Sequence, residues 1–314
     1  MNRGLAIGVD IGGTSTKIAL VDCQGRLRRQ TAIPTCTTGD PRPYFERLIS
    51  ILTSLVREGV EDQTGAEGIG ISTTGFLSSD RRAVEFSPST PALVGVDYLG
   101  LLEPLGLPVV LEADLNAAAL GEHAFGAGRG ARRLIVGVIG TGLGAGAILD
   151  GQLARFSAHQ AGDTGHVILD PAGPRCAAGC RGCAEALVSI GGVERAAAQV
   201  LASAPAEDWF PLEAGRLTAQ AVIAGARTGH PLAAKAMGEV GRWAGQWLAS
   251  LAPIFLPDRI VLCGGVAEAG DTLLEPCRVR FAELAGPYYL CQVVRGELGG
   301  LAGVVGAAVP FLLA

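Results

Sequence analysis

A glycine-rich hairpin pattern occurs twice in the chain, and this repeat constrains the fold more than any other feature of the sequence. Residues 5–22 have the pattern of an apolar strand, a turn of sequence Gly-Gly-Thr and a second apolar strand. Residues 134–150 follow the same plan, with Gly-Thr-Gly at the turn. The repeat predicts a chain whose two halves are built alike.

Strand and helix patterns alternate after each hairpin. In the first half we expect strands at 27–33, 68–72 and 109–112, and helices at 44–57 and 116–125. In the second half we expect helices at 184–202, 217–227, 231–255 and 301–313, and strands at 259–263 and 291–295. This alternation predicts layered α/β halves. A cleft between two such halves is a natural place for a ligand.

The composition excludes several classes of protein. With 314 residues, 49% of them hydrophobic and 18% charged, the chain is typical of a soluble two-domain protein. The net charge of −5 leaves no excess of Lys and Arg to neutralise phosphates, so we expect no nucleic-acid partner. Asp10 interrupts the first apolar run and Pro310 the last one, so we expect neither a signal peptide nor a membrane partner, and we expect a cytoplasmic location.

The two glycine turns are candidate phosphate sites. Glycine has no Cβ, so consecutive backbone N–H groups can approach an anion closely, and two such turns would hold a polyphosphate. The chain lacks the Gly-x-x-x-x-Gly-Lys-Ser/Thr pattern and also a Gly-x-Gly-x-x-Gly that opens a helix, so neither a P-loop nor a dinucleotide fold is favoured. Each turn taken alone is also compatible with an ordinary structural hairpin.

Two carboxylates follow predicted strands. Asp10 lies just before the first turn, where it could hold a hydrated Mg²⁺ beside phosphates or simply cap the turn. Asp114 follows another strand and opens a helix. It could accept a proton from a substrate hydroxyl, or serve only as a helix N-cap.

Three of the eight cysteines gather in one polar, glycine-rich loop that follows His166. One imidazole and three thiolates form a tetrahedral Zn²⁺ ligand set, so we expect a metal site made by His166, Cys176, Cys180 and Cys183. The alternative is a group of reduced thiols without metal. The remaining cysteines are interpreted as small hydrophobic residues.

These motifs together resemble those of sugar kinases of the ROK (repressor, open reading frame, kinase) family, and the resemblance runs nearly end to end. Residues 8–14 resemble the family's first phosphate motif, residues 140–144 its second, and residues 260–265 its nucleotide-binding segment. The resemblance implies an α/β actin-like ATPase (ribonuclease H-like) fold, with two similar α/β domains and a closing cleft between them.

The resemblance also implies a domain division and a set of cofactors. The small domain would comprise residues 1–113 and 300–314, with the last helix packed on it, and the large domain residues 114–299 with the zinc loop. The implied cofactors are ATP, Mg²⁺ and a structural Zn²⁺. We expect the protein to form a homodimer. We also expect it to bind a small sugar or sugar-like molecule as acceptor.

Site residues carried over by resemblance fall into three groups. Asp114 is the implied general base. The implied cofactor-binding residues are Asp10, Gly12, Gly13, Thr14, Lys17, Gly140, Thr141, Gly142, Gly144, Gly264 and Gly265. The implied substrate-binding residues are Gly75, Glu112, Asp114, Asp163, His166 and Glu185, and His166 is shared with zinc.

Three positions depart from the family pattern. Ala113 replaces an Asn whose amide contacts sugar hydroxyls, and Asp163 replaces a Glu and is one methylene shorter. Ala178 replaces the middle Cys of the zinc loop, and Cys180 is the residue that could substitute for it. The departures affect sugar and zinc contacts and leave the phosphate motifs intact.

The resemblance predicts transfer of the ATP γ-phosphate to a hydroxyl, by family habit the primary 6-hydroxyl of a hexose such as glucose. The departures leave open an amino sugar, an N-acetylhexosamine or a cyclitol as acceptor. A member of another class, a sugar-sensing repressor or a non-catalytic sugar-binding protein, is the second hypothesis. Repressors of the family carry an amino-terminal helix-turn-helix, whereas here the phosphate motif begins by Gly8.

Overall fold

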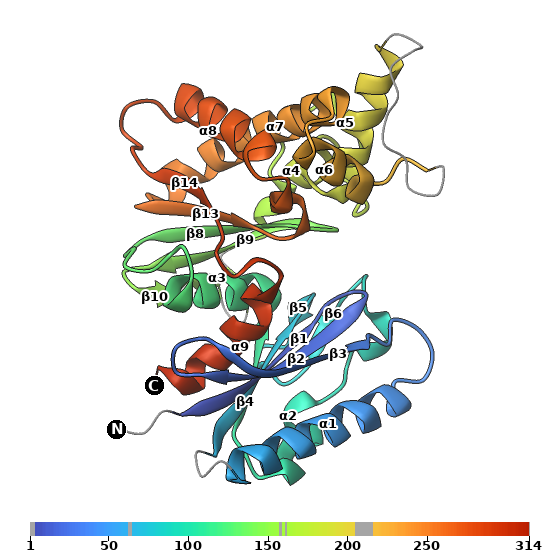
Figure 1. The fold of residues 1–314 in the computed structure, drawn as a ribbon, viewed down its shortest axis with the longest axis vertical. Coiled ribbons are helices and arrows are strands. Elements are labelled where there is room, and N and C mark those ends of the chain that lie inside the picture. Colours follow the sequence, from blue (N-terminus) through green and yellow to red (C-terminus); the bar gives the residue numbers. More distant parts are fainter. Residues whose placement is uncertain (1–3, 62–64, 157–158, 161, 205–215, 314) are drawn as a thin grey trace. The chain divides into compact units, whose positions relative to one another are not determined.

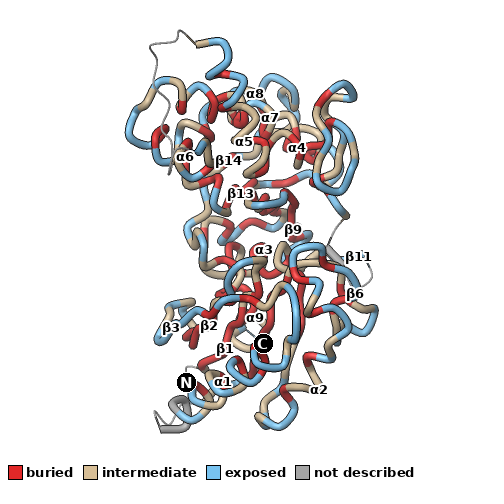
Figure 2. Tube along the Cα trace, turned by 90° about the vertical axis from the view of Figure 1, so that its right-hand side faces the viewer, coloured by how far each residue is buried: buried red, intermediate tan, exposed pale blue. Residues whose placement is uncertain are grey.

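The chain forms two compact units in a computed structural model that describes residues 4–61, 65–156, 159–160, 162–204 and 216–313 (Figure 1). Unit 1 comprises residues 1–129, 153–162 and 301–314, and unit 2 comprises residues 130–152 and 163–300. Each unit is built on a five-stranded sheet. Central strands such as β1 and β13 are buried within their own units (Figure 2).

The sheet of unit 1 has the strand order β3-β2-β1-β4-β7. Its strands are β1 (Leu5–Ile11), β2 (Ser15–Asp22), β3 (Leu27–Pro34), β4 (Ala66–Thr73) and β7 (Val109–Ala113). The first three are antiparallel, and β4 and β7 continue the sheet parallel to β1. The helices are α1 (Arg42–Glu61), α2 (Tyr98–Leu102), α3 (Asp114–Phe125) and α9 (Ala302–Leu312). Shorter elements are β5 (Phe76–Leu77), β6 (Val84–Phe86), β11 (Arg155–Phe156), β12 (His159–Gln160), η1 (Pro91–Leu93) and η2 (Glu103–Leu105).

Helix α1 covers one part of this sheet through an apolar stripe. Leu48, Leu52 and Leu55 recur at helical spacing and are buried in the same core as Ile7 and Ile69. Pro41 and Pro43 stand at the start of the helix, where a missing N–H costs no hydrogen bond.

Helix α9 lies against β1, β4 and α3 at backbone distance (Figure 1). Gly8 and Gly70 are paired across β1 and β4. A Cβ on Gly8 would lie 1.9 Å from the carbonyl oxygen of Val304, and one on Gly70 would lie 1.7 Å from that of Ala307. Any larger residue at these two positions would therefore force the helix off the sheet.

The sheet of unit 2 has the strand order β10-β9-β8-β13-β14. Its strands are β8 (Leu134–Ile139), β9 (Leu143–Leu149), β10 (Gln152–Leu153), β13 (Arg259–Cys263) and β14 (Gln292–Arg295). Strand β13 runs parallel to both β8 and β14. The helices are α4 (Ala184–Val188), α5 (Ile190–Ala202), α6 (Ala219–Arg227), α7 (Pro231–Phe255) and α8 (Asp271–Ala285), with η3 (Thr164–His166), η4 (Gly265–Ala269) and η5 (Gly299–Leu301) as 3-10 turns. The long helix α7 packs on α8 and buries Trp247 completely.

The structure confirms both hairpins and most of the expected elements, and it differs from the sequence analysis in three places. The helix expected over 184–202 is two helices, because the backbone at Ser189 is extended. The sequence pattern did not predict α8, whose second turn contains Pro276, a residue that usually ends a helix. Helix α3 packs with unit 1 through α9, whereas the boundary expected at residue 114 placed it in the second domain.

Over the described ranges, none of the helices combines the length and the apolar character that a membrane span requires.

Two glycines of α7 provide a test of the α7–α8 packing. A Cβ on Gly241 would lie 2.3 Å from the backbone oxygen of Leu273 in α8, whereas one on Gly238 would meet only Pro276 Cγ at 3.7 Å. We expect Gly241→Ala to destabilise the protein by about 1–3 kcal/mol through overpacking. Gly238→Ala is expected to stabilise it by up to about 1 kcal/mol, because alanine favours helix. Thermal unfolding of the two variants measures both effects, and equal melting temperatures would contradict this account of the packing.

Candidate active site and metal-binding cluster

The first glycine turn joins β1 to β2. The Gly12 N–H donates to the Ser15 carbonyl at 3.2 Å, and Thr14 at the tip is exposed. A Cβ on Gly13 would lie 3.3 Å from Ser89 Cβ, so the turn is closely covered on one side. A tight, partly exposed turn of this kind can present backbone N–H groups to an anion.

Asp10 lies in a row of polar side chains that crosses three strands. It pairs with Ser72 on β4, which pairs in turn with Glu112 on β7. Ser72 Oγ donates to Asp10 Oδ1 at 2.8 Å, and Lys17 is the cross-strand neighbour of Asp10 on β2. Burial raises the pKa of Asp10, against the opposing effects of the Ser72 hydrogen bond and the Lys17 charge. The hydrogen bond from Ser72 joins the half-buried Asp10 to β4.

Asp114 is the first residue of α3 and directly follows β7. The N-cap of the helix is Ala113, so the interpretation of Asp114 as the N-cap is wrong. Its Oδ1 accepts a hydrogen bond from the Leu115 N–H at 2.8 Å. Burial, together with the negative charge of Asp10, raises the pKa of Asp114 to about 7. A carboxylate with a pKa near neutrality is well matched to accept a proton at that pH.

A cluster of hydroxyl groups near the first turn was not foreseen from the sequence. Thr74 and Ser89 share a hydrogen bond of 2.9 Å, and Ser87 and Thr90 share one of 2.8 Å. Ser89 is the side chain that covers Gly13. The only sequence signal was the serine and threonine content of residues 87–90, which is ordinary for a loop.

Gly75 lies next to this hydroxyl cluster and has a φ of +102°. A Cβ there would lie 2.4 Å from the carbonyl oxygen of Phe86, so only glycine fits between the loop and β6. The structure therefore gives Gly75 a packing role in the loop that follows β4.

The second glycine turn, in unit 2, is held by α4 and α5. The Gly140 N–H donates to the Gly142 carbonyl at 2.9 Å, and the Ile190 N–H donates to the Gly140 carbonyl at 2.9 Å. Glu185 Oε2 accepts from the Leu143 N–H at 3.2 Å and would lie 2.9 Å from a Cβ on Gly142. The structure thus brings Glu185 against this turn.

The expected nucleotide-binding segment ends beside the second turn. Cys263 of β13 pairs with Val138 of β8, and the next residue, Gly264, has a φ of +91°. A Cβ on Gly264 would lie 2.5 Å from the Ile139 carbonyl oxygen, whereas one on Gly265 would meet open space. Two glycine segments therefore meet at the carboxyl ends of neighbouring parallel strands, the edge at which α/β sheets bind ligands.

Four metal-ligand residues come together in the loop after η3. The ligand atoms of His166, Cys176, Cys180 and Cys183 all lie within 4.8 Å of one another. Cys180 Sγ is 3.2 Å from Cys176 Sγ and 3.3 Å from His166 Nδ1. Ligand atoms on a tetrahedral zinc ion are roughly 3.5–3.8 Å apart, so this donor set fits zinc in number, type and spacing.

Close packing fixes the His166 end of this cluster. A Cβ on Gly165 would lie 1.9 Å from the Leu143 carbonyl oxygen, and Trp247 Nε1 donates to the Thr164 carbonyl at 2.8 Å. Asp163 Oδ2 is 3.7 Å from His166 Nε2, on the other side of the ring from the thiols. His166 can therefore bind a metal through Nδ1 while Nε2 remains directed elsewhere.

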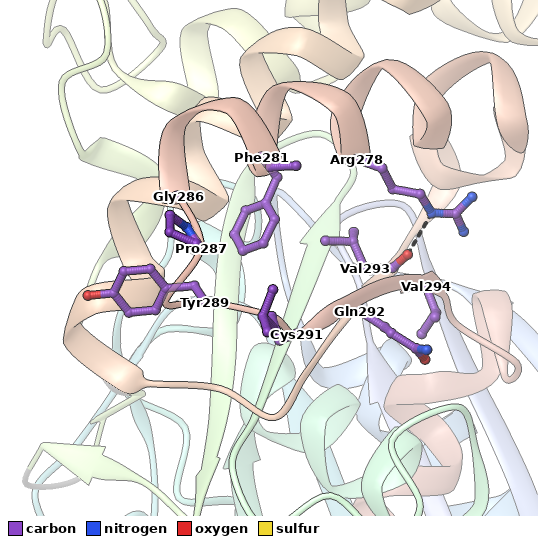
Figure 3. Close-up of a pocket in the computed structure, with 11 residues that line it drawn as sticks. Arg278, Phe281, Gly286, Pro287, Tyr289, Cys291, Gln292, Val293 and Val294 are labelled. Carbon is purple, nitrogen blue, oxygen red and sulfur yellow. Dashed lines mark hydrogen bonds between the residues drawn. The ribbon is translucent and has the colours of Figure 1, made fainter.

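A hollow of about 720 Å³ lies apart from these residues, between α8 and β14 (Figure 3). Phe281 and Val293 line it, and Arg278 Nε donates to the Val293 carbonyl at 2.8 Å. It borders the start of β14, at the opposite end of the parallel strands from Gly264. None of the predicted site residues lines it.

Comparison with known proteins identifies the family of the chain. The sequence profile of the ROK family matches residues 6–312. A glucokinase from Streptomyces coelicolor is 36% identical over 321 residues, covering 97% of this chain and 96% of that protein. An N-acetylmannosamine kinase from Citrobacter koseri is 32% identical over 206 residues, covering 65% of this chain and 68% of that protein.

Solved structures give the same result. The crystal structure of a ROK family glucokinase from Streptomyces griseus in complex with glucose and AMPPNP has a TM-score of 0.83 and 34% sequence identity to this chain. The match covers 99% of this chain and 100% of that one. The expected actin-like ATPase fold is thereby confirmed, and the chain belongs to the ROK family.

Proposed function

We propose that the protein is an ATP-dependent carbohydrate kinase that transfers the γ-phosphate to a hydroxyl of a hexose or hexose-like acceptor. The observation that carries the proposal is the setting of Asp114, a partly buried carboxylate at a strand end whose pKa is raised to about 7. The chain is also 34% identical, over 99% of its length, to a glucokinase solved with glucose and AMPPNP.

Different residues of the chain would bind the phosphates, hold Mg²⁺ and accept the proton in phosphoryl transfer. The turns at residues 12–14 and 140–142 supply backbone N–H groups for the phosphates, with Lys17 and residues 264–265 nearby in their own units. Asp10 would hold Mg²⁺, which neutralises phosphate charge when bound. Asp114 accepts the proton of the attacking hydroxyl, which we place at the 6-position of a hexose. Positioning and charge neutralisation then supply most of the rate enhancement.

The side chain at position 113 bears on the choice of acceptor. Gly75, Asp163, His166 and Glu185 are the proposed acceptor contacts, whereas Ala113 cannot donate or accept a hydrogen bond through its side chain. Loss of one amide removes a contact to a ring hydroxyl. Amino sugars, N-acetylhexosamines and cyclitols therefore belong beside glucose as candidate acceptors.

An ADP-release assay with this panel of acceptors tests the proposed function. We expect ATP consumption above background with at least one acceptor, and a phosphorylated product identified by mass spectrometry. A protein that binds a sugar but phosphorylates none of the panel would instead be a non-catalytic or repressor-type member of the family.

Substitution of Asp114 tests its proposed role as general base. Asp114→Ala should reduce turnover by roughly 10²–10⁴-fold, the range typical of a removed general base. Nucleotide affinity, measured by calorimetry with a non-hydrolysable ATP analogue, should be unchanged. Turnover at the wild-type rate would refute the assignment.

Ionisation of Asp114 is expected to lower the stability of the folded protein. A carboxyl whose pKa is raised by folding binds its proton more tightly in the folded state, so stability is lost as the pH rises from about 4 to about 7. Asp114→Asn stays neutral and should melt a few degrees higher than wild type at pH 8, with the difference fading below pH 4.

Asp258→Asn is the matched control for this pH dependence. Hydrogen bonds from Arg133 lower the pKa of Asp258, so its ionised form favours the folded state and the substitution should not raise the melting temperature at pH 8. If Asp114→Asn is no more stable than wild type at pH 8, ionisation of Asp114 does not destabilise the folded state and the prediction is wrong.

We further propose that the cluster of His166, Cys176, Cys180 and Cys183 holds one structural Zn²⁺ per chain. Four protein ligands leave no open position for water, so the ion would order the loop and orient the His166 ring rather than activate a nucleophile. Cys180 takes the place of the cysteine missing at position 178.

Elemental analysis of protein purified without added metal tests the zinc proposal. We expect close to one zinc per chain, a large loss of zinc in Cys180→Ala, and no loss in the control Cys36→Ala, whose thiol lies in unit 1. Stoichiometric zinc in Cys180→Ala would mean that the fourth ligand lies elsewhere.

A further inference from the structure

The buried carboxylate of Glu112, two residues before Asp114, is enclosed by five hydrogen-bond donors. The residue is 3% exposed. Its Oε1 accepts from the Ala113 N–H at 3.1 Å and from Asn116 Nδ2 at 2.8 Å. Its Oε2 accepts from Arg155 Nε at 3.1 Å, Arg155 Nη2 at 2.5 Å and Arg81 Nη1 at 3.4 Å.

These contacts change the role expected for Glu112. The resemblance assigned it to substrate binding, but both of its oxygens are used within the protein, and a carboxylate offers only about four lone-pair positions. A sugar hydroxyl would have to displace one of these donors. Glu112 is therefore better suited to hold the arginines than to hold the acceptor.

Arg155 comes from a segment with an unusual path. From Leu153, the last residue of β10, to Gly162 the chain belongs to unit 1, and it returns to unit 2 at Asp163. Arg155 begins β11 and pairs with Gln160 on β12. The two hydrogen bonds from Arg155 to Glu112 thus attach this excursion to β7, the strand that leads into Asp114.

The ion pair is asymmetric in burial, and this makes Arg155 hard to replace. The Glu112 side chain is 4% exposed, whereas that of Arg155 is 33% exposed. Removing Arg155 would leave the buried carboxylate with the neutral donors of Ala113 and Asn116 and with Arg81, at 3.4 Å, as its remaining cationic contact. Weaker charge compensation of a buried carboxylate is unfavourable. The hydrogen bonds from Arg155 to Glu112 therefore favour the conformation in which this segment lies against β7.

We propose that Arg155 is a positioning residue for acceptor binding. Through Glu112 it attaches the start of this excursion to β7, the strand that leads into Asp114, and Asp163 and His166 follow the excursion directly along the chain. This inference rests on the proposed kinase function, because Asp163 and His166 matter here as acceptor contacts.

Steady-state kinetics with glucose, or with the best acceptor of the panel, separate positioning from a merely structural role. We expect Arg155→Met to raise the acceptor KM by about 10–100-fold, since small misplacements of binding groups are costly. The KM for ATP and the kcat should change by less than about threefold. Arg155→Lys should recover part of the loss, because lysine keeps one charged hydrogen bond.

Two further variants complete the kinetic design. Arg155→Met combined with Glu112→Gln should be no worse than Arg155→Met alone, because the double variant replaces the under-compensated buried carboxylate with a neutral amide. Arg132→Met is the control: it removes an ion pair to Asp150 in which both side chains are more than three-quarters exposed, at 78% and 77%. It should leave both KM values unchanged.

Hydrogen exchange gives a readout that does not depend on activity. In Arg155→Met, peptides covering residues 153–162 should exchange faster, while those covering β8 and β9 should keep their protection. Unchanged exchange in 153–162, an unchanged acceptor KM, or an equal rise in both KM values with a lower melting temperature would each overturn the positioning role. If the wild-type protein phosphorylates no acceptor, the proposed function fails instead, and the exchange measurement still decides whether Arg155 anchors the segment.

Discussion

The direct backbone contact between α9 and the sheet of unit 1 is the constraint on which the candidate site depends. The helix packs on Gly8 and Gly70, and a Cβ on Gly306 of the helix would lie 1.7 Å from the Ala117 carbonyl oxygen of α3. Strand β1 carries Asp10 and α3 begins with Asp114. One helix therefore packs against both elements that supply the carboxylates. The contact is made backbone to backbone, with no intervening side chain that could change its rotamer.

The same packing explains the charge state of the site. Gly303, at the start of α9, is so close to Asp10 that a Cβ would lie 2.6 Å from its Oδ1. Burial, to which this contact contributes, is the main cause of the raised pKa of Asp10, and the charge of Asp10 adds to the burial that raises the pKa of Asp114. The tight core thus stabilises the fold while it holds two carboxyl groups in an environment that disfavours their charge. Such a conflict is typical of functional sites.

The sequence predicted those features that depend on local pattern. Both glycine hairpins, the bounds of α7 and β13, and the convergence of Cys180 with His166 agree with the structure, because strand alternation, helical spacing and loop length are local properties. The sequence could not predict the ion pair between Glu112 and Arg155. The two residues are 43 positions apart, and they meet because the chain returns to unit 1 at residue 153. The hydroxyl cluster around Ser89 and the place of α3 in unit 1 were missed for the same reason.

The departure from the family pattern in the zinc loop, Cys180 in place of a cysteine at position 178, falls where the structure tolerates it. Gly179 and Gly182, with φ of +94° and +66°, flank Cys180, and the Cys176 N–H donates to the Cys180 carbonyl at 2.9 Å, so the loop can turn a thiol inward from position 180. A metal ion requires ligand distances, not a particular order of ligands along the chain. Asp114 has no such freedom, because β7 is held in register by β4. Candidate zinc ligands on a glycine-rich loop can therefore change position along the chain, while the carboxylates on paired strands and packed helices stay in place.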